Sequence, residues 1–178
     1  MKVVIIIFAV FFVAVGAVLA YAATKPDIFT VRRTATINAA PEKVFPYIND
    51  FKSWTAWSPY EKKDPAMQRT YGSSTSGKGA TYAWNGDKNV GQGSMEILDA
   101  PAPKRVTIKL DFLKPFEAHN TADFTLEPAN GGGTQVSWTM TGPTPFIGKI
   151  LHVFIDMDKM VGRDFEAGLA NLKTIAEK

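Results

Sequence analysis

The stretch VTIKLDFLKPFEAHNTADFTL, residues 106–126, alternates apolar and polar side chains along two segments. The first segment places its apolar side chains at Val106, Ile108, Leu110 and Phe112. The second segment repeats this spacing at Ala118, Asn120, Ala122, Phe124 and Leu126. A period of two residues is typical of a strand with one covered face and one face in water. The stretch therefore predicts two strands of an antiparallel sheet.

The same alternation continues on both sides of this stretch. Its covered positions are Phe29, Val31, Ala35, Ile37, Met67, Tyr71, Tyr82, Trp84, Met95, Ile97, Val136, Trp138 and Met140. Turn-forming residues separate several of these segments, among them Asn85-Gly86 and the Asn-Gly-Gly-Gly sequence at 130–133. The pattern predicts a curved antiparallel sheet of about seven strands.

The last part of the chain changes to a helical period. Between residues 147 and 175 the apolar side chains recur in steps of three and four, at Ile147, Ile150, Leu151, Phe154, Met157, Val161, Phe165, Leu169, Leu172 and Ile175. Such spacing predicts one long amphipathic helix that lies across the sheet. Shorter helical segments are expected after Pro41 and around Phe51, Trp54 and Trp57. The fold class is therefore α+β.

The N-terminal segment from Val3 to Ala23 has 21 consecutive residues without a charge. A helix needs about 20 apolar residues to cross a bilayer. We expect a single-pass anchor over residues 1–24 and one domain over residues 25–178. A cleaved signal peptide is the alternative, because Ala20-Tyr21-Ala22 has the small-x-small pattern of a cleavage site. The apolar run exceeds the roughly 7–15 residues of a secretory h-region, which favours the anchor.

Two signals disagree about the side of the membrane on which the domain lies. Lys25, Arg32 and Arg33 follow the apolar segment and favour a cytoplasmic domain by the positive-inside rule. An export-like N-terminus favours the opposite side, and we expect an exported domain. The connector at residues 24–27 is short, so the domain should sit close to the bilayer.

The composition excludes several classes of function. Apart from Lys2, the chain has 19 basic and 17 acidic side chains, and no run of Lys and Arg occurs. The sequence therefore indicates no basic surface that could bind nucleic acid. The sequence contains no cysteine, which excludes disulfides and thiolate metal sites.

Five motifs stand out along the predicted domain. They are Phe51-x-x-Trp54-x-x-Trp57-Ser58-Pro59, Asp64-Pro65-x-Met67, Gly91-x-Gly93, Met140-x-Gly142-Pro143 and MDKMVGRDFEAGL at 157–169. Together they resemble the polyketide cyclase/dehydrase branch of the START-like (SRPBCC) superfamily, from about Phe29 to the C-terminus. The resemblance implies a helix-grip fold, in which the sheet curves around the C-terminal helix. It also implies an apolar tunnel for lipids, sterols or polyketides, and in some members cyclisation or dehydration chemistry.

Two further patterns carry no functional prediction. Residues 72–78, GSSTSGK, match most of a phosphate-binding loop, but Gly79 follows in place of Ser or Thr and a strand comes next, so we interpret them as a hairpin loop. His119 and His152 are the two histidines of the chain, and His119 falls on the wet face by alternation. We therefore expect no metal site and no cofactor.

The predicted cavity lies between the covered face of the sheet and the last helix. Its residues are Tyr82, Trp84, Met95, Phe112, Asn120, Phe124, Trp138 and Met140 from the sheet, and Phe154, Met157, Val161 and Phe165 from the helix. A filled core is the alternative for these residues, because apolar side chains usually pack inside. Three features favour a cavity. Methionine side chains adapt to varied ligands, and the polar groups of Tyr and Trp need hydrogen-bond partners. Asn120 shares the covered face with apolar residues and, when buried, also needs a partner.

The sequence thus predicts a membrane-tethered binding protein for a hydrophobic small molecule, either a lipid or a polyketide-like compound. One alternative is a cyclase- or dehydratase-type enzyme that orients its substrate with Tyr82 or Asn120. Another alternative is a protein-interaction module that uses an exposed loop at residues 60–64.

Overall fold

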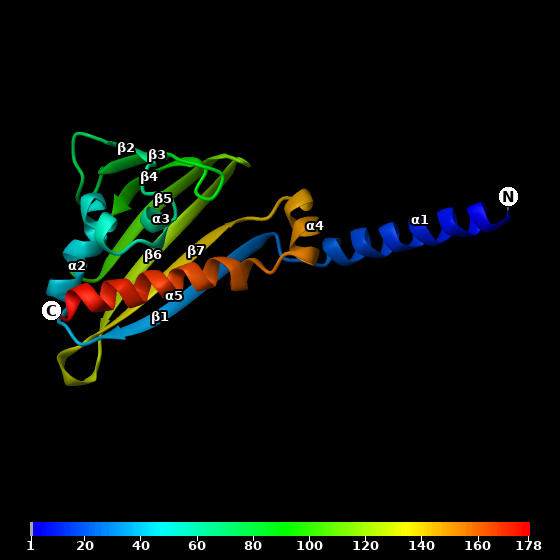
Figure 1. Cartoon of the computed structure of the whole chain (residues 1–178). Coiled ribbons are helices and arrows are strands. Elements are labelled where there is room, and N and C mark those ends of the chain that lie inside the picture. The colour runs from blue at the N-terminus through cyan, green and yellow to red at the C-terminus, as the bar shows by residue number, and fades with distance from the viewer. Residues whose placement is uncertain (1) are drawn as a thin grey trace.

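The computed structural model describes residues 2–178 and contains a seven-stranded sheet in which all neighbouring strands are antiparallel (Figure 1). The strand order is β1-β7-β6-β5-β4-β3-β2. The strands are β1 (Ile28–Ile37), β2 (Gln68–Tyr71), β3 (Thr81–Asn85), β4 (Gln92–Asp99), β5 (Arg105–Lys114), β6 (Ala118–Pro128) and β7 (Thr134–Pro143). The predicted α+β fold with a curved sheet is confirmed.

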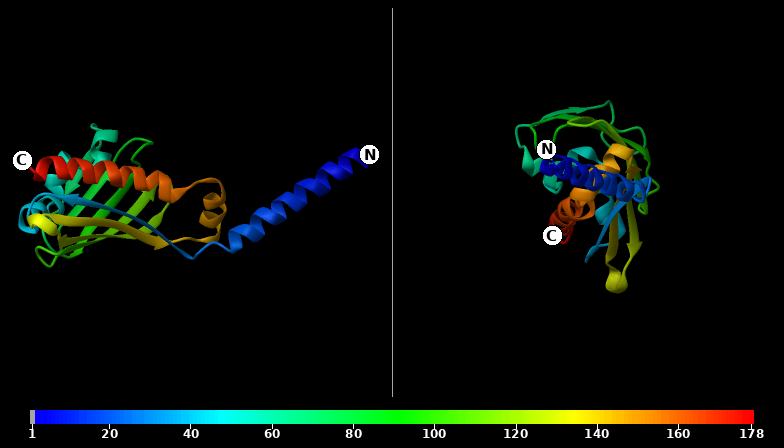
Figure 2. Two further views of the ribbon diagram at one scale, coloured as in Figure 1. Left: turned by 90° about the horizontal axis from the view of Figure 1, so that it is seen from below. Right: turned by 90° about the vertical axis from the view of Figure 1, so that its right-hand side faces the viewer.

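Helices cover the concave face of this sheet (Figure 2). They are α2 (Pro41–Asn49), the 3-10 helix η1 (Phe51–Ala56), α3 (Pro59–Lys63) and the long C-terminal α5 (Met157–Ala176); a short 3-10 turn, η2 (Asn130–Gly132), joins β6 to β7. Pro41 and Pro59 each occupy the first turn of their helix, where the missing N–H leaves no helical hydrogen bond unmade. The apolar face of α2, formed by Val44, Phe45 and Ile48, is buried as its spacing predicts.

The expectation of one continuous helix from residue 147 was wrong. The segment forms two helices, α4 (Phe146–Phe154) and α5, and Ile155 between them has extended backbone angles. The carboxylate of Asp156 caps α5 by accepting a 2.9 Å hydrogen bond from the backbone N–H of Lys159. Asp is a preferred N-cap residue because its side chain satisfies an otherwise free donor of the first turn. The cap therefore begins a new helix within an uninterrupted apolar period.

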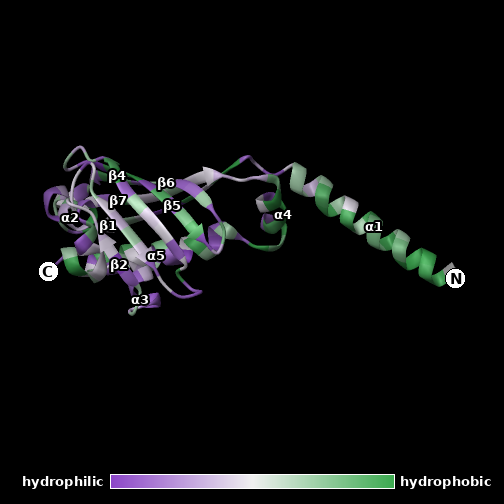
Figure 3. Cartoon of the chain, turned by 90° about the horizontal axis from the view of Figure 1, so that it is seen from above, coloured by the Kyte–Doolittle hydropathy of each residue, from purple (hydrophilic) through white to green (hydrophobic). Residues whose placement is uncertain are grey.

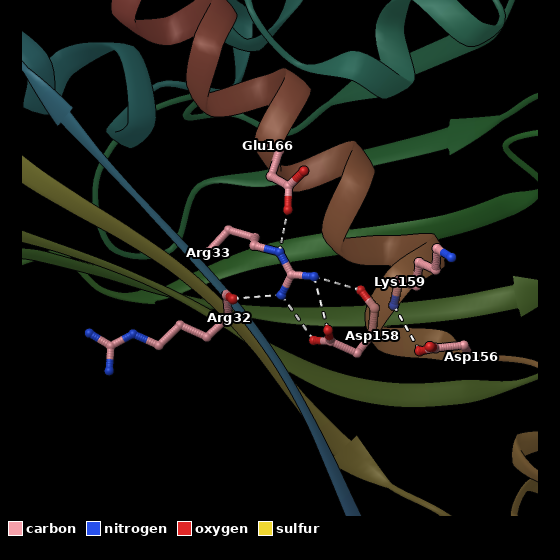
Figure 4. A network of polar contacts seen from close by, with 6 residues as sticks. All are labelled: Arg32, Arg33, Asp156, Asp158, Lys159 and Glu166. Carbon is pink, nitrogen blue, oxygen red and sulfur yellow. Dashed lines mark hydrogen bonds and ion pairs between the residues drawn. The ribbon is translucent and has the colours of Figure 1, made fainter.

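Arg33 of β1 links α5 to the edge of the sheet (Figure 4). Its Nε donates to Glu166 at 2.6 Å, and Nη1 and Nη2 each donate to the carboxylate of Asp158 at 2.9 Å. The two acidic residues lie about two helical turns apart on α5. One guanidinium therefore fixes both the position and the rotation of the first half of the helix.

The N-terminal helix α1 (Lys2–Ala23) extends away from the domain and contacts it at α4 (Figure 1). Its residues Val3–Ala23 are long and apolar enough to cross a membrane, and Figure 3 shows the hydrophobic character along the helix. An ion pair stabilises the connection to the domain, because Lys149 Nζ of α4 lies 2.7 Å from Asp27. The backbone N–H of Thr144 also donates to the carbonyl of Asp27 at 2.7 Å.

Candidate functional site

Stacked aromatic rings fill the middle of the concave face. Trp138 of β7 stacks on Phe165 of α5 with ring centroids 4.0 Å apart and planes at 8°. Phe124 stacks on Trp138 at 4.9 Å, and Trp54 and Trp57 complete the cluster with edge-on contacts. Three of the predicted cavity residues, Phe124, Trp138 and Phe165, therefore pack against one another in the core.

Coverage of the concave face decreases toward the end of the sheet where α1 lies, here called the α1-facing end. On the four neighbouring strands β4 to β7, the side chains nearer the opposite end are fully covered: Ile97, Ile108, Phe124 and Val136. On the same strands, the side chains closer to α1 keep 6–9% exposure: Met95, Leu110, Asn120 and Met140. Phe112, Met157 and Val161 at this end are half-buried. The helical cover is thus incomplete at the α1-facing end.

The polar groups of two side chains on this face, Tyr82 and Trp84, form hydrogen bonds within the protein. The hydroxyl of Tyr82 donates to Glu61 at 2.9 Å, and Arg69 donates to the same carboxylate at 2.7 Å. Burial, and then the neighbouring Glu61 carboxylate, raise the pKa of Tyr82 above its usual range, so the hydroxyl stays protonated. The indole N–H of Trp84 donates to the carbonyl of Val90 at 3.0 Å. These bonds connect the β2–β3 edge to α3 and to the β3–β4 loop.

Three other buried polar atoms have no hydrogen-bond partner among residues 2–178 and belong to the concave face or its α1-facing end. They are Asn120 Oδ1, Trp138 Nε1 and Thr144 Oγ1; a fourth such atom, Asn49 Oδ1, belongs to α2. Asn120 lies against Gly142, where an added Cβ atom would collide with Asn120 Oδ1. Leaving a buried polar atom unpaired costs about 1–3 kcal/mol, so such atoms point to water or a ligand that supplies the missing bond.

A pocket of about 560 Å³ opens beside this end of the sheet. Residues 25, 26, 28–31, 144 and 152–158 line it, so it lies between the start of β1 and the junction of α4 with α5. Phe154 and Met157 of the predicted set belong to its wall, as does Thr144 with its unpaired hydroxyl. Its volume falls within the roughly 300–1,000 Å³ range of small-molecule sites.

A smaller pocket of about 230 Å³ lies along β2 to β5. It includes Tyr82 and Met95 of the predicted set, together with polar side chains such as Ser94 and Lys109. Ser94 and Lys109 alternate with the concave-face residues of their strands and point to the convex side. This pocket is therefore separate from the one beside α4.

The break between α4 and α5 changes the environment of one predicted cavity residue. Phe154 is 72% exposed, because α4 ends there and does not continue across the sheet. Sequence reasoning also missed Glu61, Arg69 and Thr144 as functional candidates. Arg69 shares the strand alternation of Met67 and Tyr71, but that alternation does not indicate its ion pair. Glu61 and Thr144 lie outside any periodic pattern, so no local signal marks Glu61 as buried or Thr144 as unpaired.

The segment at residues 60–64 is not the exposed loop that the interaction hypothesis requires. Residues 59–63 form α3, and Glu61 within it is buried. Residues 72–78 lie between β2 and β3 and are followed by a strand, as the hairpin interpretation predicts.

His119 is exposed on the convex face and contacts two carboxylates, at 2.8 Å from Asp111 and 3.3 Å from Glu117. Its hydrogen bond with Asp111 raises the pKa of His119 above its usual value. Sequence spacing did not reveal this pair, because Asp111 is its cross-strand neighbour. Within the described part of the chain, no three His, Cys, Asp or Glu side chains are grouped in a way that could hold a metal ion.

Comparisons with known proteins agree with this architecture. Residues 29–177 match the family model described as polyketide cyclase / dehydrase and lipid transport. A search of curated proteins finds no match.

Three solved structures illustrate the shared fold. One is a protein of unknown function from Staphylococcus aureus, with a TM-score of 0.62, 10% identity, and coverage of 84% of this chain and 94% of that chain. A second is a protein from Rhizobium loti, with a TM-score of 0.61, 14% identity, and coverage of 83% of this chain and 96% of that chain. A third is the Aha1 dimer from Colwellia psychrerythraea, with a TM-score of 0.59, 16% identity, and coverage of 84% of this chain and 96% of that chain. At these identities the likeness shows the fold alone. The family model matches most of the chain, and the protein therefore belongs to the polyketide cyclase/dehydrase and lipid transport family.

Proposed function

We propose that this protein is a membrane-tethered binding protein for an amphiphilic small molecule, lipid or polyketide-like, held at the α1-facing end of the concave face. The observation that carries the proposal is the buried, unpaired Asn120 Oδ1, which lies where the helical cover is incomplete, together with the unpaired Trp138 Nε1 nearer the middle of the same face. The family description, which names polyketides and lipid transport, supports the same class of ligand.

The chemistry of the unpaired atoms defines the ligand further. Asn120 Oδ1 is an acceptor and Trp138 Nε1 is a donor, whereas Met95, Leu110 and Met140 on the same face are apolar. A hydroxyl on an otherwise apolar molecule would donate to Asn120, and a carbonyl or ether oxygen would accept from Trp138. A purely aliphatic molecule would leave both atoms unpaired, so we expect at least one polar group on the ligand.

The test is ligand retention by the full chain, followed by one substitution. Native mass spectrometry after gentle extraction should find a co-purified amphiphile, and a fluorescent lipid analogue should displace it. Asn120→Leu should weaken binding of that analogue by about fivefold, because one hydrogen bond worth about 1 kcal/mol is lost. The ligand-free variant should be at least as stable as the parent, since an unpaired buried acceptor has been removed.

Thr134→Val is the matched control. The Thr134 hydroxyl is also buried, but it donates to the Ala39 carbonyl at 2.6 Å near the opposite end of the sheet. This variant should lose about 1 kcal/mol of stability and bind the analogue with unchanged affinity. Repeated recovery of empty protein, together with no uptake of the analogue, would overturn the proposed function.

A cyclase or dehydratase is the second candidate, favoured by the buried Glu61 carboxylate beside Tyr82. A carboxylate hydrogen-bonded to a phenol is a pair that can position a proton. Loss of turnover in Tyr82→Phe with ligand retention intact would support this second candidate.

A further inference from the structure

Large apolar side chains gather on the surface at the α1-facing end of the domain. Outside α1, exposed large apolar residues are Ile28, Leu98, Leu113, Phe116, Phe146, Ile147, Leu151, Phe154, Ile155 and Met160. All of these except Leu98 lie at the start of β1, around the β5–β6 turn, on α4, between α4 and α5, or at the start of α5. Gathered apolar surface of this kind marks an interaction site.

The orientation of α4 is the opposite of that expected for a helix in water. Ile147, Leu151 and Phe154 follow one another in steps of four and three, so they form one stripe, and this stripe is exposed. The charged Lys149 is instead buried, where it pairs with Asp27. A helix that turns its charge inward and its apolar stripe outward is suited to an apolar environment.

The neighbouring helix α1 indicates what that environment is. Its apolar span, Val3–Ala23, is unburied along most of its length, and its side chains become covered only at Val18 and Ala22, in the last turns. Lys25 follows there, with its Nζ 3.1 Å from the Tyr21 hydroxyl. Tyr and Lys at the end of an apolar helix are typical of the level of the lipid headgroups. Because α4 contacts α1, its exposed stripe lies near that level.

We propose that Phe116, Ile147, Leu151 and Phe154, here called the apolar rim, insert into the surface of the same bilayer that α1 enters. The 560 Å³ pocket includes Phe154 in its wall, so insertion of the rim opens this pocket to lipid rather than to water. The exchange of ligand between bilayer and pocket rests on the proposed function, whereas contact of the rim with lipid does not.

The first experiment measures contact of the rim with lipid directly. The chain has no cysteine, so Phe116→Cys, Phe154→Cys and Leu98→Cys each give one site for an environment-sensitive fluorophore. The full chain is reconstituted in phosphatidylcholine vesicles that contain nitroxide-labelled lipid. Labels at 116 and 154 should be blue-shifted and quenched severalfold more strongly than the label at 98, which is an exposed apolar position at the opposite end.

Two results would overturn the proposal. One is equal, water-like emission at all three labelled positions. The other is a blue shift that requires a high protein-to-lipid ratio, since a second copy of the chain would then cover the rim.

The second experiment measures transfer. A double variant, Ile147→Gln and Leu151→Gln, changes two rim residues that do not line the pocket. It should slow uptake of a fluorescent lipid from vesicles severalfold and leave the equilibrium affinity for that lipid in detergent unchanged. Leu98→Gln should change neither quantity. Normal affinity with an unchanged uptake rate would overturn the role of the rim in exchange. Failure of the parent protein to bind the lipid would instead contradict the proposed function, and the labelling experiment would still decide whether the rim contacts lipid.

Discussion

At the scale of single residues, two glycines of α5 show how closely the helix approaches the sheet. A Cβ atom at Gly168 would lie 2.8 Å from the ring of Trp138 and 3.0 Å from Pro59. A Cβ atom at Gly162 would meet the guanidinium of Arg33. The first obstacle is an indole held in a buried stack with Phe165, whereas the second is a guanidinium held by the exposed carboxylates of Asp158 and Glu166.

The same substitution at these two glycines should therefore have different effects. Alanine stabilises a helix by about 1 kcal/mol relative to glycine, but overpacking a filled core costs about 1–3 kcal/mol. Gly168→Ala should lower the free energy of unfolding of the full chain in mild detergent, measured with urea. Gly162→Ala is the control and should be destabilising by less, because displacing Arg33 weakens ion pairs with two solvent-exposed carboxylates, and such pairs contribute little to stability. A Gly168→Ala protein as stable as the parent would show that the stack is looser than described.

At the scale of elements, the division between α4 and α5 decides which residues face the sheet. The apolar period continues through Phe154 and Met157 without a change of phase, so spacing alone predicts one helix. The Asp156 cap lies inside this period and begins α5. As a result, α5 packs on the sheet, whereas α4 leaves Ile147 and Phe154 exposed.

Removal of this cap should weaken the start of α5. Asp156→Ala should cost about 1 kcal/mol of stability, because the N–H of Lys159 loses its acceptor. Amide hydrogen exchange should increase in the first turn of α5 and remain unchanged near Leu169. Asn is an equally good cap, so Asp156→Asn should behave like the parent. A similar loss of stability in Asp156→Ala and Asp156→Asn would show that the charge of Asp156, and not its capping hydrogen bond, stabilises α5.

At the scale of the whole molecule, α1 extends away from the domain, and the two form an elongated arrangement (Figures 1 and 3). The pocket beside α4, the apolar rim and the end of α1 all lie at one end of the sheet. The opposite end contains the fully covered side chains such as Ile97 and Val136. The proposed function therefore assigns binding to one end of the sheet and close packing to the other.

A retained anchor follows from this arrangement as a prediction. Protein recovered from the membrane fraction should have the intact mass of about 19.5 kDa and should resist alkaline extraction. Deletion of residues 3–23 should release the domain into the soluble fraction. A mature N-terminus at Ala23 or Thr24 would show instead that the segment is a cleaved signal peptide.

The sequence by itself determined the sheet, the membrane-spanning potential of residues 3–23 and the identity of the covered face. These features depend on periods of two or 3.6 residues and on a long uncharged run, and each is a local property of the chain. The motifs around Trp54, Trp57 and residues 157–169 also carried the family resemblance that the family model confirms.

Only the tertiary structure decided which polar groups are paired. Trp84 and Trp138 occupy equivalent phases in the sequence, yet Trp84 reaches the carbonyl of Val90 and Trp138 has no partner for its indole N–H within residues 2–178. Glu61 becomes buried because α3 brings it to Tyr82, 21 positions away along the chain. Hydrogen bonding and coverage depend on the distance between segments that are remote in sequence, and periodicity contains no information about that distance.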